Sequence, residues 1–268
     1  MGNQRNALRP PIVTAKLLLY VSLPLGFRDG HAANTVVRVN PLGEARVRRR
    51  PLPDQELAPP DDPFLALAGP IVLVSRRSER SVGNALVAPV IAYVPEGKLS
   101  PPSGHMRFPG TISVPEAAFE TILEYAARSF KLHGFKDIVF LGDHGGYQAN
   151  EKNVANKLNR EWVSSNVRAH AVTQYYDATQ IDFVQILKGQ GFTLSEIGTH
   201  AGLDDTSLML ALDPSLVRED RLSDGSKFGA ADGVYGDPSK ASARLGILGV
   251  DAIVFQTVAS IKSAVSRR

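Results

Sequence analysis

The sequence has no cysteine and only one tryptophan in 268 residues. The lack of cysteine excludes a disulfide framework, a cysteine-ligated zinc finger and a cysteine nucleophile. Any metal bound by this chain must therefore use histidine, carboxylate or water ligands. The chain also lacks an apolar run approaching the roughly 18–20 residues of a membrane helix, so we expect no membrane partner. Its hydrophobic content of 43% is sufficient for a sizeable folded core.

Charge is distributed unevenly along the chain. Residues 1–80 contain 12 Lys+Arg against 7 Asp+Glu, whereas residues 81–268 contain 18 against 20. The regularly patterned part is therefore not basic, and we expect no nucleic-acid partner. An alternative is nucleic-acid binding through the arginines of residues 46–50, although no aromatic residues are interleaved there.

The N-terminal part does not continue the pattern of the rest. Residues 1–80 hold 10 of the 18 prolines and 11 Arg against 1 Lys, with neither helical nor strand periodicity. We interpret them as an irregular Arg/Pro-rich segment that precedes an α/β domain at residues 81–268. One hypothesis is that residues 30–80 are read out of frame, and the other is a divergent N-terminus. The nucleotide sequence of these codons distinguishes the two.

The first 33 residues leave the cellular compartment open. Apolar residues 17–25 follow Arg5, Arg9 and Lys16, which is the order found in a short secretory signal. The prolines within and before this run are unfavourable for a signal. We expect a cytoplasmic protein, with a periplasmic or secreted one as the alternative.

From residue 81 onward, apolar runs alternate with helical patterns. This alternation predicts a three-layer α/β fold, with a mainly parallel sheet covered by helices on both faces. The predicted strands are residues 85–94, 136–141 and 167–176, and the predicted helices are residues 115–132, 150–162, 177–188, 205–212 and a last one that starts at 237–238 and continues through 250–265.

Two short segments contain the chemically active side chains that such a fold needs. Residues 142–150 place His144 between an acid and two glycines at the carboxyl end of a predicted strand. Open α/β sheets place their ligand sites at this end of the strands. Residues 200–210 supply His200 and two carboxylates directly before an apolar helix. If the two segments converge, they form a metal or acid/base site.

Four segments in order resemble the creatininase (creatinine amidohydrolase) family. They are residues 103–113, 142–146, 200–214 and 233–242. The resemblance implies a three-layer α/β fold, hexameric assembly and two divalent metals, zinc or manganese, per subunit. It also implies hydrolysis of a C–N bond in a small, often cyclic amide. Two cations suit that reaction because they lower the pKa of water and polarise the amide carbonyl.

The resemblance also suggests roles for individual residues. His144 corresponds to a metal ligand, with Asp143 and Asp205 as further candidate ligands, and His200 to the residue that moves a proton during C–N cleavage. An imidazole suits that role because its ordinary pKa lies near neutrality. The residues expected to line the substrate pocket are His105, Gly145, Gly146 and Tyr147.

Non-catalytic interpretations of the same residues remain open. His144 could simply turn the chain, His200 could hydrogen-bond its loop, and Asp205 could cap a helix. The family's first motif, a Glu-x-His or Glu-Gln-Asn-Gly-Pro-His string before residue 83, is absent from this sequence. The alternative to a metal-dependent amidohydrolase is therefore a non-catalytic member of the family with fewer metals or none.

Overall fold

The computed structural model describes residues 17–22, 35–39, 45–49, 82, 85–108 and 111–266. The chain divides into two compact units, one of Met1–Leu23 with Pro63–Arg268 and one of Pro24–Asp62. In the second unit, β2 (Thr35–Val39) and β3 (Ala45–Arg49) form an antiparallel pair. Most of the predicted irregular segment lies outside the described residues, so its interpretation stays a prediction.

The first unit contains a four-stranded sheet in the order β4-β1-β5-β6. Its strands are β1 (Leu17–Ser22), β4 (Ala85–Val87), β5 (Asp137–Gly142) and β6 (Arg168–Ala171). β5 and β6 pair in parallel, as expected, whereas β1 pairs antiparallel with both β4 and β5. The parallel pair contains the strand that leads into the site described below.

The helices follow in chain order around this sheet. They are α2 (Glu116–Leu132), α3 (Gln148–Glu161), α4 (Gln174–Asp177), α5 (Val184–Gly189), α6 (Leu194–Ile197), α7 (Leu203–Leu212) and α8 (Ala243–Ser266). Shorter turns are the 3-10 segments η1 (Gly104–Arg107), η2 (Gly145–Tyr147), η4 (Pro214–Leu216), η5 (Glu219–Lys227), η6 (Ala230–Asp232) and η7 (Pro238–Lys240), and the π-helical η3 (Ala178–Phe183).

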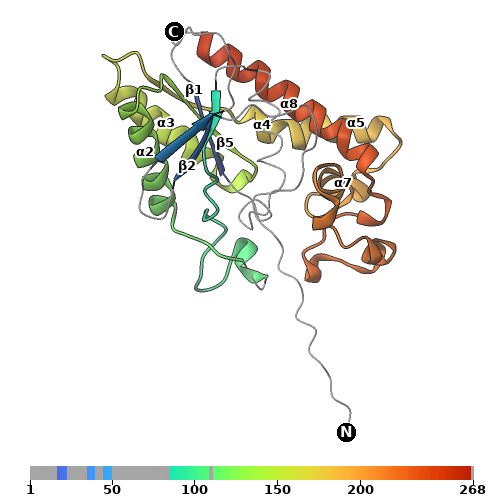
Figure 1. The fold of residues 1–268 in the computed structure, drawn as a ribbon. Helices are drawn as coiled ribbons and strands as arrows, with labels where there is room; N and C mark the ends of the chain where they lie inside the picture. The colour runs from blue at the N-terminus through green and yellow to red at the C-terminus, as the bar shows by residue number, and fades with distance from the viewer. Residues whose placement is uncertain are drawn as a thin grey trace. The chain divides into compact units, whose positions relative to one another are not determined.

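The central strand β5 has a hydrophobic core on each side. Ile138 and Phe140 pack in one core with residues of α2 and α3, whereas Val139 and Leu141 pack in a second core with residues of α4 and α8. This alternation follows from the two-residue period of a strand. Figure 1 shows α2 and α3 on one side of the strands and α8 on the other. The predicted α/β class with helices on both faces is confirmed.

Most predicted elements are present, and three differ in extent. The strand expected at residues 85–94 ends at Val87, shortly before Pro89, which has no N–H for a sheet hydrogen bond. The strand expected at 167–176 ends at Ala171, where the chain turns into α4. The last helix begins at Ala243 instead of Pro238. The 3-10 turn that Asp237 caps ends after three residues, and Ala241 after it is extended.

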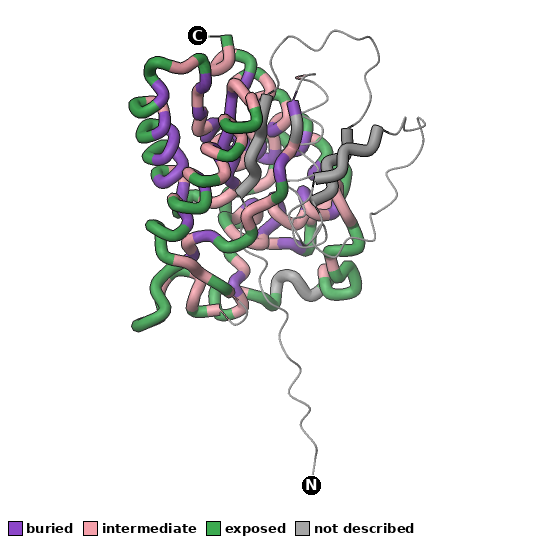
Figure 2. The backbone as a smooth tube through the Cα atoms, turned by 60° about the vertical axis from the view of Figure 1, so that its left-hand side comes forward, coloured by how far each residue is buried: buried purple, intermediate pink, exposed green. Residues whose placement is uncertain are grey.

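The helices present one face to the interior. Buried and exposed stretches alternate along them in Figure 2. α8 is long and apolar enough to cross a membrane by length and composition, with 39% of its most apolar window buried. Leu245, Val250, Ile253 and Ile261 of this helix lie in the core of the domain. The apolar character of α8 is therefore accounted for, at least in part, by its place in the core.

Candidate metal centre

The first part of the site is a tight loop between Glu96 and His105. The backbone N–H of His105 donates to the carbonyl oxygen of Glu96 at 2.9 Å. A Cβ added to Gly97 would lie 2.0 Å from the carbonyl oxygen of Ser103, and one added to Gly104 would lie 2.5 Å from that of Glu96. Both glycines also have positive φ, at +141° and +58°. Only glycine allows this close approach, which brings the two side chains together.

Three potential metal-ligating side chains converge at this loop. The Nδ1 atom of His105 lies 2.7 Å from Oε2 of Glu96, and Nε2 of His144 lies 3.7 Å from the same oxygen. One ligand atom from each of the three residues lies within 4.8 Å of the others. Glu96 is only 4% exposed. Among the described residues, this is the one such group of three histidine or carboxylate ligands.

The loop after β5 holds His144 in place. The side-chain amide of Gln148 donates to the carbonyl oxygens of Gly142 and His144, at 3.0 and 3.1 Å. A Cβ at position 146 would lie 2.5 Å from Nε2 of His144, so Gly146 leaves the space that the imidazole needs. Burial, helped by the neighbouring His105 and His200, lowers the pKa of His144 to about 4. The imidazole is therefore neutral at pH 7, as a metal ligand must be.

The loop before α7 brings His200 to the same place. Its Nε2 atom lies 3.0 Å from Nε2 of His105, and the two rings meet edge to face. The carbonyl oxygen of His200 accepts the N–H of Tyr235, whose own carbonyl oxygen accepts the N–H of Thr199. Burial lowers the pKa of His200, and the charge of Asp205 opposes this shift.

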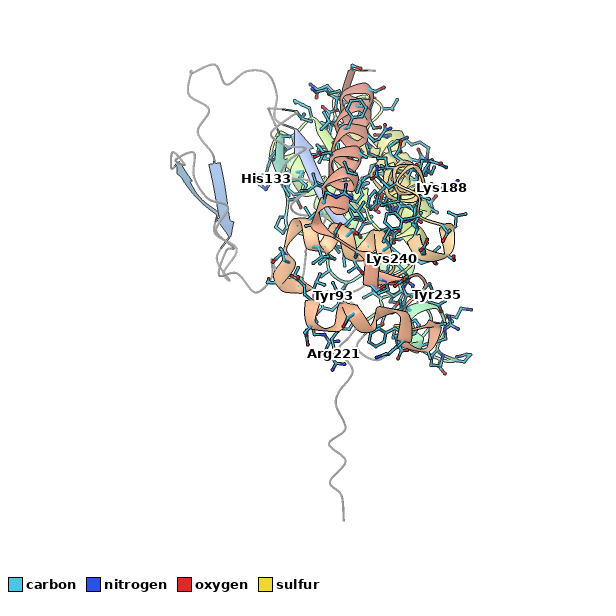
Figure 3. All side chains as sticks on the ribbon, turned by 90° about the vertical axis from the view of Figure 1, so that its right-hand side faces the viewer. Tyr93, His133, Lys188, Arg221, Tyr235 and Lys240 are labelled. Atoms are coloured by element: carbon cyan, nitrogen blue, oxygen red, sulfur yellow. The ribbon has the colours of Figure 1, made fainter. Side chains whose placement is uncertain are left out.

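The segment after Tyr235 also fixes this loop. Lys240 donates a hydrogen bond to Glu196 at the end of α6, and the N–H of Asp237 donates to the carbonyl oxygen of Glu196 at 2.8 Å. Tyr235 and Lys240 are both labelled in Figure 3. A Cβ added to Gly202 would lie 2.2 Å from the carbonyl oxygen of Ile197. The glycine that follows His200 by two residues therefore permits a close backbone contact.

The two acids after His200 lie in the first turn of α7. The Asp205 carboxylate accepts the N–H of Ala201 at 2.9 Å, a local bond at the start of the helix. This contact stabilises Ala201, whose φ of +50° is unusual for a residue other than glycine. Burial and the neighbouring Asp205 charge raise the pKa of Asp204 to about 8. The suggested role of Asp205 as a ligand stays a prediction, since it is outside the group of three.

The remaining predicted residues surround the imidazole of His144. Asp143 accepts a hydrogen bond from the Tyr147 hydroxyl at 3.3 Å, and it too is outside the group of three. Tyr147 is fully buried, and its ring centroid lies 5.5 Å from that of His144. A Cβ at Gly145 would lie 3.0 Å from the hydroxyl oxygen of Tyr176. The predicted ligand and substrate-binding roles of these residues stay predictions.

Glu96 was not expected from the sequence. The expected sites supplied His105, His144 and His200, which the structure brings together, but not the carboxylate between them. The available signal was local: a glutamate followed by glycine, then a glycine and a histidine eight and nine residues later. Such a pattern brings an acid and an imidazole together only if the intervening loop closes on itself.

Comparisons with known proteins bear on the family and the fold of the chain. A family model described as creatinine amidohydrolase matches residues 68–261. The mycofactocin precursor peptide peptidase of Mycolicibacterium smegmatis is 27% identical over 179 residues, which span 61% of this chain and 61% of that protein. A point mutant of creatininase is 25% identical, covers 73% of this chain and 81% of its own, and superposes with a TM-score of 0.54. A crystal structure of creatinine amidohydrolase superposes with a TM-score of 0.56. It is 24% identical, covers 73% of this chain and 80% of its own, and supports the fold alone.

Proposed function

The chain belongs to the creatininase family, and from this premise we propose that it is a metal-dependent amidohydrolase that cleaves a C–N bond of a small amide. The observation that carries the proposal is the convergence of Glu96, His105 and His144 beside His200. Metal-ligating atoms and a candidate proton carrier then share one site at the carboxyl end of β5, where open α/β sheets bind their ligands.

The donor set fits zinc or manganese. Two imidazole nitrogens and one carboxylate oxygen are the protein ligands of many catalytic zinc sites. The buried carboxylate of Glu96 supplies negative charge, and the lowered pKa of His144 keeps its lone pair available at neutral pH. Glu96, His105 and His144 would hold the cation. When bound, it would supply Lewis acidity that activates water and polarises the amide carbonyl.

We assign to His200 the transfer of the proton that amide cleavage requires. Its lowered pKa keeps the ring neutral at pH 7, so that one nitrogen accepts a proton and later donates it to the leaving amine. The contact with His105 orients the ring, in the way that a second group orients a catalytic histidine. Tyr147 and Tyr176 lie against the His144 loop, and we assign them to the pocket wall together with Gly145 and Gly146.

Zinc binding tests the proposal directly. We expect the metal-free protein to bind zinc with a defined stoichiometry in calorimetry, and a His144→Ala variant to lose that binding. His170→Ala is the matched control, because His170 is also a half-buried imidazole bonded to a carboxylate, at 3.0 Å from Asp137. The loaded protein is then assayed with creatinine, other cyclic amides and amide-containing peptides. Wild-type protein that binds no zinc would support the alternative of a non-catalytic family member.

We also propose a homo-oligomer in the cytoplasm, with a hexamer as the form that the family resemblance implies. Three large apolar side chains on α2 support a contact between subunits, because Ile122, Tyr125 and Leu132 are 42%, 67% and 81% exposed. Light scattering of the purified protein measures the assembly. A monomer at all concentrations would contradict it.

A further inference from the structure

Tyr235 is paired with His200 through the backbone. The two residues form an antiparallel bridge, in which the N–H of Tyr235 donates to the carbonyl oxygen of His200 at 2.8 Å. Residues that lie opposite each other in an antiparallel pair carry their side chains on the same face, with Cβ atoms about 4.5–5.5 Å apart. The phenol of Tyr235 therefore leaves the backbone on the same face as the imidazole of His200.

Two glycines make this close pairing possible. A Cβ added to Gly198 would lie 1.9 Å from the carbonyl oxygen of Tyr235, and one added to Gly236 would lie 2.7 Å from Cα of Gly202. Gly198 and Gly236 also have positive φ, at +82° and +154°. Side chains are excluded at both positions, so the two segments meet backbone to backbone. This junction fixes the root of one large side chain, that of Tyr235, next to His200.

The side chain of Tyr235 has a free surface. The residue is 41% exposed, and its hydrogen bonds to the described part of the chain use its backbone alone. No aromatic or imidazole ring of the described residues stacks on it. A tyrosine offers a large contact area at a low cost in conformational entropy, because only two χ angles must be ordered. Such a ring, held beside a candidate proton carrier, is suited to contact with a ligand.

We propose that Tyr235 contacts the substrate, and that its ring receives an aromatic group on the nitrogen side of the scissile amide. In the proposed function His200 protonates the leaving nitrogen, so a residue beside this imidazole faces the group that the nitrogen carries. Aromatic rings bind one another in offset-stacked or edge-to-face contacts that add to the burial of apolar area. The inference rests on the proposed function and deepens it, since it names the class of amide that the site selects.

Replacing this side chain tests contact with a ligand separately from folding. The bridge to His200 uses backbone atoms, so Tyr235→Ala removes the ring and leaves the backbone hydrogen bonds in place. Tyr235→Leu also removes the ring but keeps an apolar side chain, and Tyr235→Phe removes only the hydroxyl. Phe255→Ala is the matched control, because Phe255 is an aromatic residue that is 71% exposed on α8.

Two hydroxamates serve as probes in calorimetry with the zinc-loaded, full-length protein. N-methylacetohydroxamate and N-phenylacetohydroxamate share the group that chelates zinc and differ only in the substituent on nitrogen. We expect the wild type to bind the phenyl compound more tightly than the methyl compound. Tyr235→Ala should lower this preference about tenfold and leave the dissociation constant of the methyl compound within about twofold of wild type. Tyr235→Leu should lower the preference too, whereas Tyr235→Phe and Phe255→Ala should keep it.

The outcomes separate this inference from the proposed function. If both hydroxamates bind but the wild type has no preference for the phenyl compound, or Tyr235→Ala keeps the full preference, the inference is overturned and the metal site stands. An equal loss of preference in Phe255→Ala would also overturn it, because the effect would then not be specific to Tyr235. If the wild-type protein binds no zinc, the proposed function fails and the inference fails with it.

Discussion

Among the residues that the structure describes, two histidines are hydrogen-bonded to a buried carboxylate, and only one of these two pairs lies in a candidate metal centre. His105 bonds Glu96 at 2.7 Å, and His170 bonds Asp137 at 3.0 Å. Both carboxylates are buried, at 4% and 0% exposure. The first pair has His144 and His200 beside it, whereas no third ligand joins the second pair among the residues that the structure describes.

The difference follows from where the pairs lie in the fold. Asp137 begins β5, and His170 lies on the neighbouring strand β6 at the edge of the sheet. Glu96 and His105 come from a loop that meets the carboxyl end of β5, where the chain leaves the sheet and other loops converge. A histidine and a carboxylate therefore form a candidate site only where the topology brings a third and fourth group.

The largest expected difference between the pairs is in zinc affinity. Glu96→Gln keeps the shape of the side chain but removes its charge, and we expect it to weaken zinc binding by over roughly 100-fold. Mutating a group that only supports a ligand lowers metal affinity by roughly 10–100-fold, so the expected loss is larger. Asp137→Asn makes the same change in the other pair and should leave the dissociation constant within about twofold of wild type. Calorimetry on both variants measures this. Equal losses of zinc affinity in Glu96→Gln and Asp137→Asn would mean that neither pair is the metal site.

A second prediction concerns the structural role of the sheet edge near His170. The Nδ2 atom of Asn159 donates to the carbonyl oxygen of Ala169 at 2.8 Å, and its Oδ1 atom accepts the N–H of Ala169 at 2.9 Å. These two hydrogen bonds stand in place of hydrogen bonds to a neighbouring strand. Asn159→Ala should reduce the free energy of unfolding by about 1–2 kcal/mol through the lost hydrogen bonds. Asn153→Ala, an exposed change on the same helix, should be neutral or stabilising by about 0.5 kcal/mol.

Urea unfolding of the two asparagine variants provides the comparison. Zinc affinity should be unaffected in both, because neither residue belongs to the ligand group. If Asn159→Ala unfolds at the same urea concentration as Asn153→Ala, the amide does not stabilise the sheet edge.

Much of the fold could be predicted from the sequence because its signals are local. The apolar spacing of α2 and the continuous buried run of β5 match the structure to within about a residue. The strand around residues 167–176 was predicted too long, since an apolar run alone does not show where β6 stops and α4 begins. The antiparallel pairing of β1 depends on contacts distant in the sequence, and no local pattern indicates it.

The candidate site was predictable in part. His144 follows a strand directly, so its position at the carboxyl end could be inferred from neighbours in the sequence. Glu96 could not, because its meeting with His105 depends on positive φ at Gly97 and Gly104 and on backbone contacts that no helical or strand period encodes. The contact of His200 with His105, 95 residues away in the sequence, was not predicted, since the family resemblance gave each of the two residues only a separate role.

A third prediction concerns Gly146, which lies against the imidazole of the candidate ligand His144. An alanine at position 146 would bring its Cβ to 2.5 Å from Nε2 of His144, so the imidazole must move. We expect Gly146→Ala to weaken zinc binding by about tenfold, which is about 1.4 kcal/mol. Gly189→Ala is the matched control, because a Cβ at Gly189, the last residue of α5, meets nothing within 4 Å. Unchanged zinc affinity in Gly146→Ala would show that the ring has room to shift.

The smallest expected effect is the contribution of His170 to the pH dependence of stability. Burial and the nearby Arg168 lower the pKa of His170 to about 4, against an ordinary value of 6.5. Between these values the unfolded chain binds more protons than the folded one, so the stability present above pH 6.5 is lost as the pH falls towards 4. For this one residue we expect about 1 kcal/mol between pH 7 and pH 5, after allowance for partial exposure. Urea unfolding of the metal-free wild type and of His170→Ala at both pH values measures this contribution. We expect the variant to be less stable at pH 7 but to lose less free energy of unfolding between pH 7 and pH 5. Equal losses of free energy in the two proteins would contradict the lowered pKa.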